Sequence, residues 1–209
     1  MPKSEIFDEH YEQYEEWFEK NENAYLSELD AVREALPKDG IGIETGVGSG
    51  RFAGPLDIEF GIEPSMKMAM IALRRGVGVI AGCAEYLPVG KDKFDFALMV
   101  TALCFVDDAV ASMREAYRIL KPGGCFVIGF IDRESPIGRV YQKAKEKSLF
   151  YRDATFYSCD EVAVLLKDAG FGRLSFSQTL FTDPREMEAP DKSKDGYGEG
   201  SFVVVKGIK

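Results

Sequence analysis

The chain of 209 residues is long enough for one α/β domain of ordinary size and too short for two. Its formal net charge of −9 argues against a nucleic-acid partner, which would require a basic face. No segment reaches the length of a membrane span, and the first ten residues lack the apolar core of a signal peptide. We therefore expect a cytoplasmic protein that binds neither nucleic acid nor membranes.

The cysteines are scattered through the sequence and form no C-x-x-C pair. Most of them lie in apolar runs, as small buried hydrophobic residues do. We expect reduced thiols, with neither a disulfide framework nor a metal site. The four are Cys83, Cys104, Cys125 and Cys159.

Two helices are predicted within residues 7–36, because hydrophobic residues recur there at helical spacing. Aromatic residues are dense in residues 14–18, which have the sequence YEEWF. The simpler interpretation is an amphipathic helix that buries an aromatic stripe. The functional interpretation is a helical cap, residues 1–36, that covers a ligand pocket, and the two are compatible.

Residues 41–50, IGIETGVGSG, are predicted to form a buried strand that runs into a glycine-rich loop beside a ligand. The spacing departs from the dinucleotide-binding pattern G-x-G-x-x-G, because position 51 is arginine. Glu44, two residues before the first glycine, would repel a pyrophosphate and suits a cation such as a sulfonium. The pattern resembles motif I of the class I S-adenosylmethionine-dependent methyltransferases. An ordinary turn between strand and helix is the alternative.

Only a short helix, within residues 51–56, is expected before the next strand, residues 58–62. That strand ends at Glu63, and a carboxylate at this edge can accept hydrogen bonds from ribose hydroxyls. The following Pro64 and Met66 resemble the second motif of the family, although Pro64 also fits a plain helix start.

A third strand is predicted at residues 77–83, and the sequence after it, AEYLP, resembles a further family motif. The family often has an aspartate at the position of Cys83, where it accepts the adenine amino group. Because a thiol is a poor acceptor, the adenine is expected to be held mainly by the backbone at Ala84. Glu85 is expected in a loop or a helix cap more than as a ligand.

The fourth strand, residues 94–101, is a nearly continuous apolar run, as in the centre of a parallel sheet. The resemblance places its last residues, Val100 or Thr101, beneath the sulfonium. A helix is predicted at 107–120, and residues 115–124, EAYRILKPGG, match the family closely as a helix stop before the strand at 125–131.

Residues 133–157 follow the fifth strand and are interpreted as a lid-like insertion over the ligand site, with a basic helix at 139–148. A helix packed on the domain edge is an equal alternative for that basic segment. A helix at 160–169 and two strands, 171–181 and 202–208, complete the chain. The loop between those strands, 182–200, is expected to be too acidic and proline-rich to pack well.

The resemblance implies a single α/β domain, residues 1–209, with a Rossmann-like, doubly wound sheet of seven strands. The strand order is 3-2-1-4-5-7-6, with the seventh strand antiparallel. The implied cofactor is S-adenosylmethionine. Its implied binding residues are Glu44, Gly46, Gly48, Gly50, Glu63, Pro64, Met66, Cys83, Ala84, Glu85, Val100 and Thr101.

The implied activity is methyl transfer to a small molecule, in the manner of the methyltransferase domain 11-like enzymes. The acceptor atom, nitrogen, oxygen, sulfur or carbon, is left open, as is the choice between monomer and homodimer. A base is needed only if the acceptor must first lose a proton. The candidates by residue type are His10, Tyr11, Tyr14 and Tyr151.

Two alternatives to a methyltransferase remain. Aminopropyl transfer is disfavoured because residues 101–107 lack paired aspartates. A non-catalytic protein that binds S-adenosylmethionine or S-adenosylhomocysteine is compatible with the same motifs.

Overall fold

A mostly parallel sheet of eight strands organises residues 4–209, the part of the chain that the computed structural model describes. The order is β3-β2-β1-β4-β5-β8-β6-β7, and β8 runs antiparallel to both β5 and β6. The predicted order is confirmed, with β8 as the antiparallel strand, but β7 is an additional two-residue edge strand. The strands are β1 (Gly42–Thr45), β2 (Phe60–Glu63), β3 (Gly78–Ala81), β4 (Phe94–Val100), β5 (Leu120–Ile131), β6 (Gly172–Thr179), β7 (Lys194–Asp195) and β8 (Phe202–Ile208).

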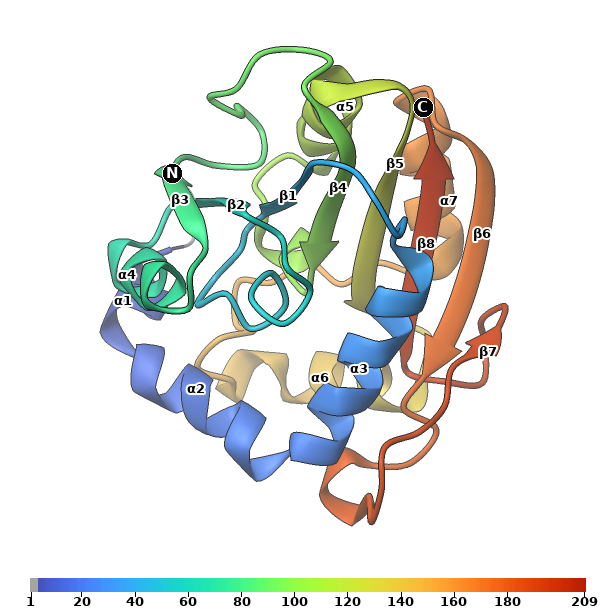
Figure 1. Ribbon diagram of the computed structural model, residues 1–209. Coiled ribbons are helices and arrows are strands. Elements are labelled where there is room, and N and C mark those ends of the chain that lie inside the picture. The colour runs from blue at the N-terminus through green and yellow to red at the C-terminus, as the bar shows by residue number, and fades with distance from the viewer. Residues whose placement is uncertain (1–3) are drawn as a thin grey trace.

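Helices cover both faces of the sheet. Figure 1 shows α3 in front of β5 and β8, with α5 and α7 behind the sheet. The helices are α1 (Glu5–Glu9), α2 (Tyr11–Lys20), α3 (Glu22–Ala35), α4 (Met66–Arg74), α5 (Ala109–Ile119), α6 (Pro136–Ala144) and α7 (Cys159–Asp168), with 3-10 turns η1 (Leu103–Phe105), η2 (Lys145–Lys147) and η3 (Pro184–Glu186).

The continuous apolar sequence of β4 is explained by its burial on both faces. Phe96 and Leu98 pack in the cluster formed with α2 and α3. Ala97 and Met99 pack in the opposite cluster, with α5 and α7. Successive side chains of a strand point to opposite faces, so a central strand between two helical layers requires apolar residues throughout.

The N-terminal segment forms three helices, where two were predicted. The backbone leaves the helical region at His10 and again at Asn21, which separate α1, α2 and α3. Asn21 also donates its side-chain amide to the carbonyl of Trp17, at 2.8 Å, and so caps the end of α2. The predicted cap began at residue 1, and residues 1–3 lie outside the described part.

The predicted short helix at residues 51–56 is wrong, because the segment forms turns. Single hydrogen bonds join Gly54 to Gly50 and Leu56 to Phe52, and a left-handed Asp57, with φ 55°, ends the run. The segment is nevertheless anchored, because Phe52 is buried.

Side-chain caps set the starts of the later helices. Ser135 accepts from the Gly138 amide, so α6 begins at Pro136, three residues before the predicted start. Ser158 and Glu161 form a capping box that starts α7.

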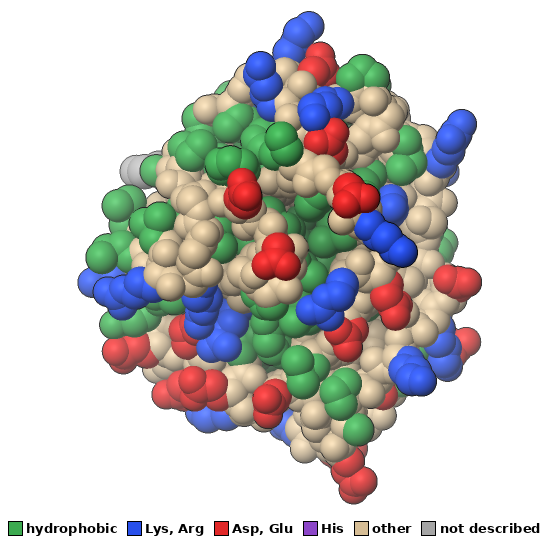
Figure 2. All heavy atoms as spheres, in the orientation of Figure 1, with side chains coloured by type: hydrophobic (Ala, Val, Ile, Leu, Met, Phe, Trp, Pro, Cys, Tyr) green, Lys and Arg blue, Asp and Glu red, His purple; other side chains and the backbone are tan. Residues whose placement is uncertain are grey.

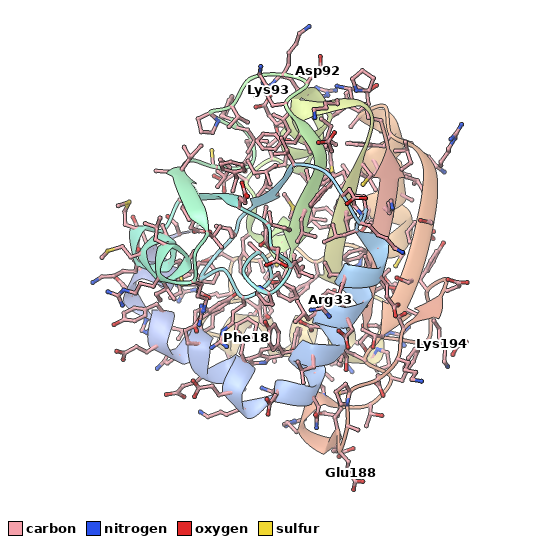
Figure 3. All side chains as sticks on the ribbon, viewed as in Figure 1. Phe18, Arg33, Asp92, Lys93, Glu188 and Lys194 are labelled. Carbon is pink, nitrogen blue, oxygen red and sulfur yellow. The ribbon has the colours of Figure 1, made fainter. Side chains whose placement is uncertain are left out.

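Residues 182–200 pack against α3, contrary to the prediction. Asn23 donates to the Met187 carbonyl at 2.8 Å, and the Asp191 amide donates to Ser27 at 2.8 Å. These bonds satisfy backbone groups of the loop despite its acidic sequence. Glu188 lies at the outer tip of this segment (Figure 3).

Candidate functional site

The glycine loop begins where β1 ends, at the carboxyl edge of the parallel strands. The amides of Gly46 and Val47 both donate to the Ile62 carbonyl, at 2.8 and 3.0 Å, which fixes the loop to β2. Gly46, Gly48 and Gly50 have φ values of 72°, 54° and 79°, a region that favours glycine.

The three glycines have different roles. A Cβ at Gly46 would lie 2.6 Å from Ala102, and one at Gly50 would lie 3.2 Å from the backbone of Ala72. A Cβ at Gly48 would meet no atom closer than the Tyr14 hydroxyl, at 3.6 Å. Gly50 therefore serves packing against α4, whereas Gly48 is a wall of an open cleft.

We call this opening the glycine-loop cleft, a cavity of about 100 Å³. Most residues of the predicted cofactor site line it together with Tyr14, one of the proposed bases. Those predicted residues are Gly46, Gly48, Glu63, Pro64, Cys83, Ala84, Glu85, Val100 and Thr101.

Glu44, Gly50 and Met66 do not line the cleft. Met66 is 62% exposed, while Met68, two residues further along α4, is 2% exposed and lines the cleft. Ser65 caps α4 by accepting from the Met68 amide, and this start sets which methionine faces inward.

Glu63 is held by the glycine loop itself. Its Oε2 accepts from the Gly48 amide and its Oε1 from the Ser65 amide, both at 2.8 Å. Burial raises the pKa of Glu63 to about 7, although these two hydrogen bonds oppose the shift. Each carboxylate oxygen retains a second acceptor position for a ligand in the cleft.

Two buried oxygens beside the loop have no hydrogen-bond partner within residues 4–209: Glu44 Oε2 and Ser49 Oγ. Glu44 is 1% exposed, and burial raises its pKa well above the ordinary value. Orphaned polar atoms of this kind are rare in a folded protein. A ligand with a cationic or hydrogen-bonding group beside the loop fits them, directly or through water.

Glu85 holds the loop that follows β4. Its Oε1 accepts from the amides of Asp107 and Asp108, at 2.7 and 3.3 Å. Glu85 lies in a turn, as the sequence predicted, and from there it fixes the loop before α5. Cys83 lies just after β3, and burial raises the pKa of its thiol.

A larger cavity, of about 820 Å³, adjoins the cleft. We call it the aromatic cavity, because rings from several segments line it. The two openings share four lining residues, which form a junction between them: Phe7, Tyr14, Thr101 and Phe105. Thr101 has a left-handed backbone, with φ 51°, a strained conformation that is common at functional sites. Phe18 points inward from α2 (Figure 3) and also lines this cavity.

The N-terminal helices and the segment after β5 meet over this junction. Phe7 stacks on Phe150 with ring centroids 5.5 Å apart, and Tyr14 lies edge-on to Phe150 at 6.2 Å. On the other side of α2, Glu15 forms ion pairs with Arg51 and Arg75, at 2.6 and 2.5 Å. The N-terminal helices are therefore fixed both to the later segment and to the base of the glycine loop.

Of the proposed bases, only two reach these openings. His10 and Tyr11 lie outside both linings, and Tyr11 donates to the adjacent Glu12. Tyr14 lies at the junction, and Tyr151 lines the aromatic cavity. Burial raises the pKa of both phenols far above the ordinary value, so each remains protonated at neutral pH.

One acidic residue of the aromatic cavity was missed from the sequence. Glu28 of α3 is 3% exposed and lines the cavity. The available signal was its spacing, since Glu28 lies four residues after Ala24 and four before Val32, which are both fully buried.

Comparisons with known proteins identify the family. The family model described as methyltransferase domain matches residues 43–128. A crystal structure from Thermotoga maritima, described as a SAM-dependent methyltransferase and possible histamine N-methyltransferase, is 53% identical. It superposes with a TM-score of 0.97, over 98% of this chain and 99% of that one. An uncharacterized protein from Methanocaldococcus jannaschii is 44% identical over 206 residues, 98% of each chain. The 2-methoxy-6-polyprenyl-1,4-benzoquinol methylase of Xenopus laevis is 27% identical over 138 residues, 57% of this chain and 44% of that protein.

Proposed function

The chain belongs to the S-adenosylmethionine-dependent methyltransferases, and we propose that it methylates a small molecule bound in the aromatic cavity. The observation that carries this proposal is the junction, where Tyr14 and Thr101 are walls of both openings. A cofactor in the cleft and an acceptor in the cavity would meet there.

The residues present fit S-adenosylmethionine, which supplies a methyl group already activated by a sulfonium. Glu63 would accept the ribose hydroxyls, and Met68 and Ala84 would flank the adenine. Glu44, whose Oε2 has no hydrogen-bond partner within residues 4–209, does not line the cleft and would reach the amino-acid part through water. Gly48 allows the ligand to approach the bare backbone.

The contribution of this chain to the reaction would be alignment. With an activated methyl group, holding the acceptor in line with it provides most of the acceleration. Tyr14 and Tyr151 keep their protons at neutral pH, so in the proposed reaction they orient an acceptor through their hydroxyls and do not remove a proton from it. The packed rings of Phe7 and Phe150 would exclude water from the junction.

The N-terminal helices and residues 133–157 would act as a cap and a lid over the acceptor. Their contacts support this division of labour, because Phe7 and Tyr14 pack directly on Phe150. Ligand exchange would then require the two segments to separate.

A small acceptor is also supported by the surface. Figure 2 shows acidic and basic side chains interspersed on the face in view, with no continuous basic patch there for a phosphate backbone.

Within residues 4–209, none of the helices has the length and apolar character needed to cross a membrane. The four free thiols are compatible with the expected cytoplasmic location, and we keep monomer or homodimer as the expected state.

The test has two stages. In calorimetric titrations, S-adenosylmethionine and S-adenosylhomocysteine should bind and NAD should not. In the second stage, pooled small-molecule acceptors and a donor labelled in the methyl group should yield a labelled product and S-adenosylhomocysteine. Binding of NAD alone would overturn the assignment of the cleft, and binding without turnover in any pool would favour a non-catalytic sensor.

A further inference from the structure

Glu28 is a buried carboxyl group that has no side-chain partner in the described part of the chain. It lies on the inner face of α3, it is 3% exposed and it lines the aromatic cavity. Within residues 4–209 no hydrogen bond or ion pair is formed by its side chain, whose pKa is raised by burial alone, to about 8. An isolated buried carboxylate is costly, so its retention here requires an explanation.

The other charged residues of the cavity wall are already compensated. Lys20 pairs with Glu16 at 2.6 Å, and Arg185 pairs with Asp183 at 2.7 Å. Among the described residues that line the cavity, Glu28 is thus the one ionisable group whose charge is not balanced by a neighbour.

The surroundings of Glu28 are aromatic. Its charge contributes to raising the pKa values of Tyr14, Tyr141 and Tyr151, so the three phenols lie within electrostatic range of it. All three line the same cavity, as do Trp17 and further phenylalanines. Aromatic faces attract cations, and most strongly where water is excluded.

We propose that the acceptor carries an amino group and that Glu28 binds this group as its cation, between the aromatic walls of the cavity. The proposal rests on the proposed function, which it narrows from any small acceptor to an amine. Tyr14 connects the two parts, because it lies near Glu28 and also lines the glycine-loop cleft. Glu28 is then a specificity-determining residue.

The alternative interpretation is a neutral carboxylic acid that is simply buried. The two interpretations are separated by matched ligand pairs that differ only in charge. We suggest phenethylamine with phenethyl alcohol, and hexylamine with hexanol, each titrated into the protein saturated with S-adenosylhomocysteine. The proteins compared are the wild type, Glu28→Gln and Glu22→Gln, the last of which removes an exposed carboxylate from the same helix.

The wild type should prefer each amine to its alcohol by roughly ten- to a hundred-fold, the range expected for one charge-assisted contact. Glu28→Gln should abolish this preference while retaining the affinity for the alcohols and for S-adenosylhomocysteine, and Glu22→Gln should behave as the wild type. Equal binding of amines and alcohols by the wild type, or an unchanged preference in Glu28→Gln, would overturn the proposal. Failure of S-adenosylhomocysteine to bind the wild type would instead refute the assignment of the cleft, which is a separate result.

Discussion

Replacing Glu28 by glutamine should change how the stability of the fold depends on pH. Burial moves the pKa of this side chain from its ordinary 4.5 to about 8. At 1.36 kcal/mol for each pKa unit, the full shift corresponds to about 5 kcal/mol. Glu28 lines a large cavity that can admit water, which weakens the effect of burial. We therefore expect its titration to change the free energy of unfolding by about 2–5 kcal/mol.

The sign follows from the direction of the shift. The folded chain keeps a proton on Glu28 that the unfolded chain has already released, so the unfolded state binds fewer protons between about pH 4.5 and pH 8. Stability must therefore fall as the pH rises through this window. Tyr14, Tyr141 and Tyr151 keep their protons throughout it, and Glu63, with a pKa of about 7, adds a decline of the same sign in both proteins.

The assay is urea unfolding at several pH values from about 5 to about 8.5. Glutamine does not titrate, so Glu28→Gln should lose less stability across the range and should exceed the wild type at the alkaline end. Glu22→Gln should follow the wild type, because Glu22 is exposed. If the free energies of unfolding of the wild type and Glu28→Gln changed in parallel with pH, the pKa of Glu28 would not be raised by folding, and this prediction would be refuted.

Three further predictions concern the cleft and the cap. Glu63→Ala should weaken S-adenosylhomocysteine binding roughly ten- to a hundred-fold by calorimetry, because it removes the proposed ribose acceptor and frees the Gly48 amide. An unchanged Kd in a folded variant would mean that the carboxylate serves only the loop. Saturating cofactor should change the fluorescence of Trp17, the sole tryptophan, and slow hydrogen exchange in residues 5–20 and 136–157. No change in either signal would show that Trp17 belongs to a static core. Gly50→Ala should lower the free energy of unfolding by about 1–3 kcal/mol in thermal or urea unfolding, since φ is 79° and α4 leaves no room; a neutral result would show that the loop relaxes.

The strand order was implied by the family resemblance, and most of the cleft follows from the motifs, because each one lies where a predicted strand ends. Parallel strands bring their carboxyl ends to one edge, so Gly48, Glu63 and Ala84 meet although they are distant in the chain. Which side chains of a helix face the cleft is harder to predict from the sequence. Met66 was predicted in the cofactor site, but the hydrogen bond from the Met68 amide to Ser65 sets the start of α4 so that Met68 lines the cleft instead.

Long-range packing explains what the sequence concealed. The segment 182–200 has an acidic, proline-rich composition typical of an exposed loop, yet Ser27 and Asn23 of α3 hold its backbone. Glu28 was missed for the related reason that a glutamate in an amphipathic helix is normally counted toward the solvent face. Glu28 lies on the same face of α3 as Ala24, but this spacing indicates burial only when that face of the helix is known to be covered.

The three most buried carboxyl groups of the site lie on both sides of the junction. Glu44 and Glu63 are at the glycine loop, and Glu28 is at the aromatic cavity. An ammonium nitrogen has no lone pair, so the bound cation must first release one proton to solvent. Methyl transfer to the resulting neutral amine then moves one positive charge from sulfur to nitrogen, since the sulfonium becomes a neutral thioether and the product is again an ammonium. In the proposed complex, an ionised Glu28 would lie on the side that gains this charge, and a carboxylate already fixed in a cavity with little water stabilises developing charge without reorganisation. The same group would then select the acceptor and favour the transfer, so for a bound amine Glu28→Gln should lower kcat as well as raise KM, whereas a residue that only binds would change KM alone.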